Sequence, residues 1–265
     1  MRQLGRSHAR AYYADVRART TIMNIATLSK HLPLVINYIQ TPPGDCLLEV
    51  VHLVESSRYH LTNLNELIVG NGNAPINFIP GVDFRGEVLN EHWRVMASWI
   101  ELEAFLNAAK RCLDRSWCCL GEQLGEDAKN IRTLGKAVHS SNKIIKKEEV
   151  KEILNNSKYF QLLIDAWENW GAELADLRNY VEHDAPLGGR AFGYTQVTPD
   201  GQIIKIMIPD IIPSRSESTP KREFTYNEQK TAEVYGQKII NELDVLVNNL
   251  LSIGDDLKYY EHFQL

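Results

Sequence analysis

The feature that most constrains this 265-residue chain is a long helical repeat of apolar residues between positions 160 and 181. Its members follow one another at steps of three and four residues, which places them along one side of an α-helix. Such a side must be buried against other helices, so the chain is expected to contribute to a helical bundle. The repeat ends before Pro186 and Gly188-Gly189. Its members are Phe160, Leu163, Trp167, Trp170, Leu174, Leu177 and Val181.

Other segments repeat with the same period and predict an all-α fold. A long helix is expected from about residue 47 to 68, with Gly70 and Gly72 where a C-cap would fall, and a shorter one precedes it from about Thr27 to Ile39. The segment from Val88 to about Leu120 is apolar on more than one side, which is typical of a central helix. Its apolar residues include Trp93, Met96, Ile100 and Ala104, with Trp99, Leu106, Leu113 and Trp117 around them.

The last helix is expected to bury a stripe along one side and to start at a capping box formed by Thr225 and Glu228. Residues 121–141 are interpreted as a loop or broken helix, and residues 142–156 as a short charged helix. The lysines of that helix could contact phosphate, but the interspersed glutamates favour a solvated face. The expected stripe is Tyr235, Ile239, Leu243, Leu246, Leu250 and Ile253, and the lysines are Lys143, Lys146, Lys147 and Lys151.

One segment differs in kind from the helices around it. Two β-rich runs flank Pro199-Asp200-Gly201, which predicts a small β-hairpin at about Ala191 to Pro209 inserted in the helical protein. Residues 1–22 hold five arginines and one acidic residue and are interpreted as a basic tail. Residues 23–265 are expected to form a single helical domain.

Charge and cysteine content exclude several classes of protein. A net charge of −5 and a pI near 5.9 argue against coating nucleic acid by bulk electrostatics, so any RNA contact must be focused. Cys46, Cys112, Cys118 and Cys119 form neither a CxxC pair nor a secreted disulfide framework, and we expect reduced core thiols. No apolar run is long enough for a membrane span and no secretory leader is recognisable, which favours a cytoplasmic protein.

Common catalytic signatures are missing from the sequence. Glu49 and His52 form one ExxH pair, but a di-iron bundle needs a second ExxH and two more glutamates, so no metal site and no cofactor are expected. The stretch PLGGRAFG lacks the lysine of a phosphate-binding loop. There is no GxSxG elbow, HExxH or kinase signature.

The end of the most regular helix offers a different chemistry, in the stretch RNYVEH with Arg178, Asn179 and His183. Histidine exchanges a proton near neutral pH, and arginine presents a permanently charged planar fork to phosphate. The spacing alone decides nothing, because chance predicts about 1.4 Arg-to-His pairs of this spacing and the chain has four. Only Arg178 is followed directly by Asn, Asp or His, and only this pair closes a long amphipathic helix.

Helical geometry separates the two charged groups, because five residues at about 100° each place Arg178 and His183 about 140° apart. Either the helix loosens before Pro186, or two copies meet about a two-fold axis through a face that includes Ala172 and Ala175. The alternative without chemistry is that Arg178 pairs with Glu182 while His183 caps the helix C-terminus.

At these residues the chain resembles the HEPN family of all-α proteins. The family motif is an arginine, four to six residues and a histidine, often with Asn, Asp or His directly after the arginine. Many members carry a tyrosine two residues after the histidine, where this chain has Ala185. The resemblance implies an antiparallel helical bundle, a homodimer with a composite cleft, and metal-independent endoribonuclease activity in toxin or defence settings, with an antitoxin or other partner protein.

The sequence therefore supports one leading hypothesis and two others. In the first, a HEPN-like ribonuclease uses His183 for proton transfer, Arg178 for phosphate charge and Asn179 to orient the histidine or the phosphate. In the second, the chain is a non-catalytic HEPN-like module for binding or dimerisation. In the third, it is a purely structural bundle.

Overall fold

The computed structural model of the chain describes residues 42–69, 87–183, 193–198, 201–210 and 225–253. Side chains are described for these except at residues 42–45, 69, 87–95, 181–183, 193–198 and 201–204. The expected basic tail of residues 1–22, the helix from Thr27 to Ile39 and the glycines Gly70 and Gly72 lie outside the described residues.

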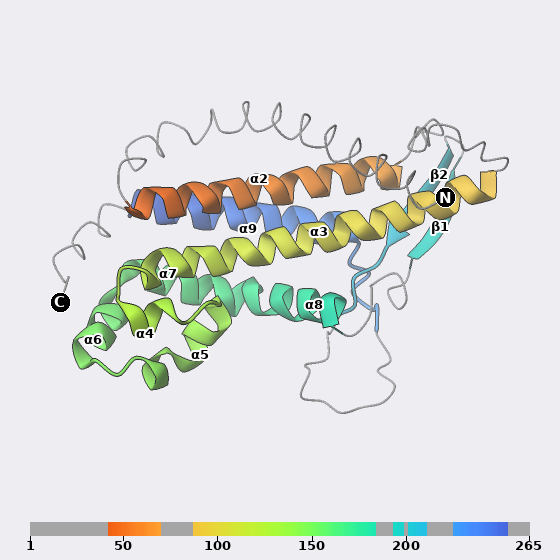
Figure 1. Ribbon diagram of the computed structural model, residues 1–265. Helices are drawn as coiled ribbons and strands as arrows, with labels where there is room; N and C mark the ends of the chain where they lie inside the picture. Colours follow the sequence, from red (N-terminus) through yellow and green to blue (C-terminus); the bar gives the residue numbers. More distant parts are fainter. Residues whose placement is uncertain (1–41, 70–86, 184–192, 199–200, 211–224, 254–265) are drawn as a thin grey trace, which may run out of the picture.

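Four long helical segments run side by side with alternating direction (Figure 1). They are α2 (Pro42–Val69), α3 (Glu87–Gly121), the segment formed by α7 (Lys158–Ala166), η1 (Trp167–Gly171) and α8 (Ala172–His183), and α9 (Ala232–Ser252). Each coincides with a helix expected from apolar periodicity, and the all-α class is confirmed. The bundle forms because every one of these segments has an apolar side that needs partners.

Helix α3 is central, as its apolar character predicts, since it packs against α2, α7, α8 and α9. Its Trp99, Leu106 and Trp117 are buried in one continuous core. The expectation is wrong for part of its first half, because Met96 is 40% exposed and Ile100 is 60% exposed. That side of α3 is an outer surface.

Close approach of α9 to α2 depends on Gly236, because a Cβ there would lie 2.4 Å from Cδ1 of Leu61. Polar contacts add to the packing of α2. Arg58 donates to both carboxylate oxygens of Asp244 in α9 at 2.8 Å, and His60 Nδ1 lies 2.7 Å from a carboxylate oxygen of Glu101 in α3. Bidentate and charge-assisted contacts of this kind fix the relative rotation of neighbouring helices.

Three short helices form a lobe at one end of the bundle, between α3 and α7 (Figure 1). They are α4 (Glu126–Lys129), α5 (Leu134–Ile144) and α6 (Glu148–Asn156). Helix α5 starts at Thr133, whose hydroxyl accepts from the Lys136 N–H. The broken helix expected from residue 121 is therefore α4 and α5, and the charged helix is the shorter α6.

The π-helical turn η1 brings Trp167 against α5. A Cβ at Gly135 would lie 2.6 Å from the Trp167 ring, so this glycine permits the contact. One turn later, the Trp167 indole donates to His139 Nε2 at 3.3 Å. The ring is thus held between two positions of one helix.

Strands β1 (Gly193–Thr198) and β2 (Gly201–Ile206) pair antiparallel, with Thr198 opposite Gly201. They lie at the end of the bundle opposite the lobe (Figure 1). Residues 199 and 200 of the expected turn lie outside the described residues.

The expected capping box of α9 is wrong. The Asp210 carboxylate accepts from the N–H groups of Asn227 and Glu228 at 2.6 and 2.9 Å, and Thr225 accepts from the Asp210 N–H. These bonds hold residues 225–230 in a turn, and Thr231 caps the helix by accepting from the Val234 N–H. The buried stripe is confirmed from Tyr235 to Leu250, while Ile253 is half-buried.

The expectation of four reduced cysteines is also wrong, because Cys46 and Cys119 form a disulfide. The antiparallel pairing of α2 and α3 brings these residues, 73 positions apart in the chain, to a Cα–Cα distance of 5.5 Å. Cys112 and Cys118 are free thiols. Among the described residues, no helix is long and apolar enough to cross a membrane.

Candidate functional site

Arg178 and Asn179 lie on α8, in the half of the helix that is farther from the lobe (Figure 1). The apolar residues Leu174 and Leu177 fix the rotation of the helix because both are fully buried. This rotation leaves Arg178 and Asn179 half-buried at the edge of the packed side. A half-buried arginine keeps its charge accessible while its stem packs against the protein.

Two amides orient the Arg178 guanidinium. Its Nε donates to Oδ1 of Asn107 in α3 at 2.9 Å, and its Nη1 donates to Oδ1 of Asn179 at 3.2 Å. The Asn107 side chain is itself held, since its Nδ2 donates to the Glu103 carbonyl at 3.0 Å. These two amide oxygens fix the direction of the fork.

Asn179 contacts Arg178 directly. The expectation was that it orients the histidine or the phosphate, and in the structure its amide oxygen accepts from Arg178. Asn107 was not singled out by the sequence analysis at all. Its signal is a lone amide between Leu106 and Ala108, inside the segment that the sequence predicts to be the central helix.

His183 is the last residue of α8, and its side chain lies outside the described ones, as does that of Glu182. The backbone nevertheless tests one expectation. The helix stays α-helical through His183, so it does not loosen between Arg178 and His183. The two residues therefore leave the helix about 140° apart, as regular geometry requires. The expected pairing of Arg178 with Glu182 involves a side chain that lies outside the described ones.

The dimer face expected through Ala172 and Ala175 needs correction. Ala175 is only 4% exposed and belongs to the hydrophobic core, and Ala172 is half-buried against it. The buried arc of α8 is wider than the seam in the sequence, because it also includes Tyr180. A second copy cannot approach through Ala175, and a bulky side chain there would disturb the bundle itself.

The ExxH pair is not a metal site among the described residues. Glu49 forms an ion pair with Arg115 in α3, with 2.7 Å between the carboxylate oxygen and Nε, and His52 is exposed. In the described part of the chain, no group of three or more His, Cys, Asp or Glu side chains could hold a metal ion.

No protein-family model matches the sequence, and no significant match was found among curated proteins or solved structures. The candidate site is therefore defined by the contacts of Arg178 and by the position of His183 in α8.

Proposed function

We propose that this chain is a metal-independent endoribonuclease of the HEPN type, with a role as a toxin or in defence. The observation that carries the proposal is the orientation of Arg178 by the neutral oxygens of Asn107 and Asn179. A guanidinium held in this way is suited to a phosphate, because the geometry of its planar fork is set before the ligand binds.

The chemistry follows from the two side chains. His183 takes the proton of a ribose 2′-OH, and the 2′ oxygen attacks the adjacent phosphorus. Arg178 stabilises the added negative charge of the phosphorane. The bond to the 5′ oxygen then breaks and this oxygen is protonated, which leaves a 2′,3′-cyclic phosphate and a 5′-hydroxyl.

Helical geometry favours two copies at each cleft. Because α8 remains helical through His183, one chain presents Arg178 and His183 on different sides. A two-fold dimer would let Arg178 of one copy and His183 of the other meet at one phosphate. Since Ala175 is buried, the contact would use described residues of α8 outside the core, such as the exposed Asp176 and the half-buried Asn179. Light scattering that shows a monomer at micromolar concentrations would remove this version of the site.

The test is RNA cleavage by the purified full chain in EDTA. Cleavage should persist, yield a 2′,3′-cyclic phosphate, and stop when the 2′-OH beside the scissile phosphate is replaced by hydrogen. Cleavage that disappears in EDTA and returns with Mg²⁺ would contradict the proposal.

The second candidate is a non-catalytic module for binding or dimerisation. The contact between Arg178 and Asn107 favours it, since that bond also joins α8 to α3. In this case an Arg178→Ala variant would lose stability, and the wild-type chain would cleave no RNA.

A further inference from the structure

A basic stretch in the lobe is unusual for a chain with a net charge of −5. Residues 130–147 contain five lysines and arginines and no acidic residue. All five side chains are exposed. They are Arg132, Lys136, Lys143, Lys146 and Lys147.

Helix α5 separates these charges from the core. Leu134, Ala137 and Ser141 are buried on its inner side. Lys136 and Lys143 are seven residues apart, which places them on one outer face two turns from each other. The helix therefore holds cations at fixed positions.

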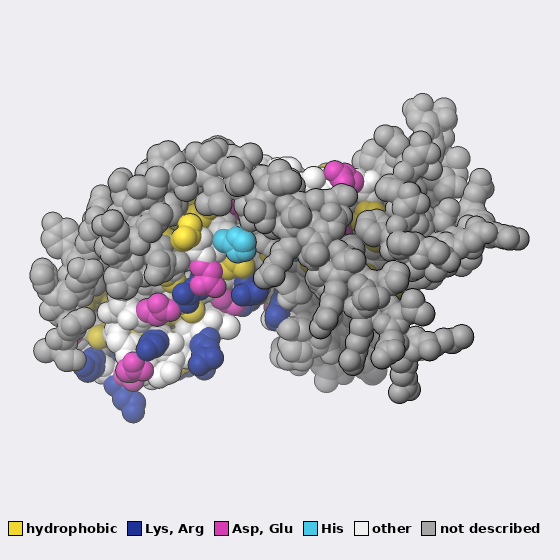
Figure 2. All heavy atoms as spheres, turned by 45° about the horizontal axis from the view of Figure 1, so that its top comes forward, with side chains coloured by type: hydrophobic (Ala, Val, Ile, Leu, Met, Phe, Trp, Pro, Cys, Tyr) yellow, Lys and Arg dark blue, Asp and Glu magenta, His cyan; other side chains and the backbone are white. Residues whose placement is uncertain are grey.

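Two of the acidic residues nearby pair with other lysines, and a third, Asp127, accepts from the backbone N–H of Lys146 at 3.5 Å. Glu126 pairs with Lys129 at 3.3 Å, and Glu148 pairs with Lys151 at 2.6 Å. None of the five cations makes an ion pair with a described residue. Figure 2 shows Lys and Arg side chains on the described surface at the lower left, with acidic side chains interspersed among them. The stretch has no acidic residue of its own, and Glu148 and Glu149 follow it directly in the sequence.

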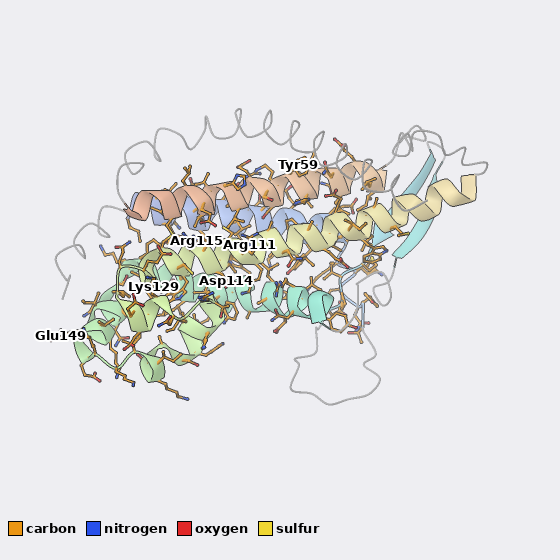
Figure 3. All side chains as sticks on the ribbon, in the orientation of Figure 1. Tyr59, Arg111, Asp114, Arg115, Lys129 and Glu149 are labelled. Atoms are coloured by element: carbon orange, nitrogen blue, oxygen red, sulfur yellow. A yellow bond between two sulfur atoms is a disulfide. The ribbon has the colours of Figure 1, made fainter. Side chains whose placement is uncertain are left out.

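Helix α3 places this stretch and Arg178 on the same side of the bundle. Asn107 and Asp114 are seven residues apart on α3, so they share one face, about 10 Å apart along the axis. Asn107 accepts from Arg178, and Asp114 Oδ1 accepts from the Leu134 N–H at the start of α5. Arg111 lies between them and is exposed. Figure 3 shows Arg111 and Asp114 on the part of α3 that runs toward the lobe.

We propose that these six cations form a basic surface that binds the phosphate backbone of an RNA strand and leads it to Arg178. The surface consists of Arg111, Arg132, Lys136, Lys143, Lys146 and Lys147. Lysines contact phosphate as point charges without reading bases, so the surface binds RNA of any sequence. The choice of RNA as the strand rests on the proposed function.

The structure favours RNA over a membrane surface. A helix that binds membranes needs a free apolar face beside its cations. The apolar face of α5 is already buried in the core. The large hydrophobic residues that are exposed among the described ones are Met96, Ile100, Val234 and Val245, and all lie outside the lobe.

The separation sets a length requirement. A stacked strand advances about 3.4 Å per nucleotide, so about three nucleotides cover the roughly 10 Å along α3 between Asn107, which contacts Arg178, and Asp114, which contacts the start of α5. A dinucleotide substrate could occupy the site at Arg178 without contacting α5. Only longer RNA should benefit from the basic surface.

The test compares two double variants of the full chain that remove the same charge. Lys136→Gln with Lys143→Gln changes the basic surface, and Lys205→Gln with Lys238→Gln changes lysines on β2 and α9. Both double variants and the parent chain with which they are compared carry His183→Ala, so that the RNA is not cleaved during the measurement. Binding of a fluorescent RNA of about twelve nucleotides, long enough to span both places, is measured by anisotropy in EDTA at several salt concentrations.

We expect the α5 variant to raise Kd by on the order of tenfold and to make the log–log salt slope shallower by about 1.4, since each lost contact to a single strand removes about 0.7. The control should match the parent. Equal affinity of both variants overturns the basic surface, as does binding to phosphatidylserine vesicles without binding to RNA. Circular dichroism checks the fold, and Lys146→Gln with Lys147→Gln provides a second test.

Cleavage by chains that retain His183 separates the two proposals. If the wild-type chain cleaves nothing but RNA binding depends on α5, the basic surface stands and the ribonuclease proposal falls. If RNA is cleaved and the α5 variant has an unchanged KM for long RNA, the ribonuclease stands and the basic surface falls. If both hold, the α5 variant has a raised KM for long RNA and an unchanged one for a dinucleotide.

Discussion

Arg178 and Asn107 are 71 residues apart in the chain, yet the guanidinium Nε of the first donates a hydrogen bond of 2.9 Å to the amide oxygen of the second. This contact joins α8 to α3 and fixes the direction of the arginine. It makes Asn107 a positioning residue whose effect on Arg178 can be separated from its effect on stability.

Asn107→Asp should keep the acceptor but neutralise the arginine. Cleavage should fall by on the order of tenfold or more, because a carboxylate beside Arg178 competes with the phosphate. The melting temperature should change little, because the new ion pair with Arg178 offsets the lost bond from Asn107 Nδ2 to the Glu103 carbonyl. Asn107→Ala should cost about 1 kcal/mol of stability by removing the bond. Thermal unfolding and gel-based cleavage measure the two effects. Asn248→Asp, at an exposed position of α9, controls for the added charge, and full activity of Asn107→Asp would contradict the positioning role.

Arg178→Ala and His183→Ala should each reduce the cleavage rate by on the order of 10²-fold or more, since each group acts mainly in the transition state. Arg178→Lys should remain impaired because a point charge does not replace the planar fork. His52→Ala, at an exposed position of α2, should leave the rate unchanged. Single-turnover rates decide the matter, and cleavage that survives both alanine variants would rule out this pair.

The two deeply buried tyrosines should respond oppositely to removal of their hydroxyls. Tyr159 donates to the Ser116 carbonyl at 3.0 Å, whereas the Tyr235 hydroxyl has no hydrogen-bond partner among the described residues. Burial raises the pKa of both. Tyr159→Phe should therefore cost about 1 kcal/mol, and Tyr235→Phe should be neutral or stabilising. Denaturant unfolding of the two variants provides the comparison, and an equal loss in both would be the wrong result.

Gly135→Ala should destabilise the contact between α5 and η1 by about 1 to 3 kcal/mol, because the new methyl group would overlap the Trp167 ring. Trp167→Phe should reduce that penalty in the double variant, since the smaller ring leaves room. A double-mutant cycle of unfolding free energies measures the coupling. Additive effects of the two changes would mean that the ring is not held as the structure indicates.

Two thiols per chain should react under denaturing conditions without reductant, and four after reduction. Cys119→Ser should destabilise the chain by roughly 4 kcal/mol, the entropy expected for cross-linking residues 73 positions apart. Cys118→Ser keeps the disulfide and serves as the control. In the native state Cys112 should resist alkylation, because burial raises its pKa to about 12. Four reactive thiols before reduction would exclude the disulfide.

The sequence predicts the long helices well because their apolar spacing records which side is buried. Leu174 and Leu177 lie where this pattern places them. The apolar spacing predicts less well the features that depend on contacts between different segments of the chain. Ala175 is small and could face either solvent or core, and the width of the buried arc decides between them. The cap of α9 is Thr231 and not the expected Thr225. The reason is that Asp210, from another segment, accepts from the N–H groups that a cap at Thr225 would need.

In the candidate site, too, the sequence predicts the residues within one helix but not the contacts between helices. Arg178 and Asn179 could be chosen from the stretch RNYVEH, because a charged residue and an amide end an apolar seam. Asn107 could not be assigned to Arg178, since only the packing of α3 against α8 brings them together. The Cys46–Cys119 disulfide was missed for the same reason.

The disulfide between Cys46 and Cys119 also makes part of the first half of the protein a covalently closed loop. Together with the intervening peptide bonds it closes a ring that runs from Cys46 to Cys119. A protease that cuts once inside this ring opens it without separating the molecule, and the two pieces part only when a reductant is present. Under denaturing conditions, a cut after Cys119 releases a fragment without any reductant.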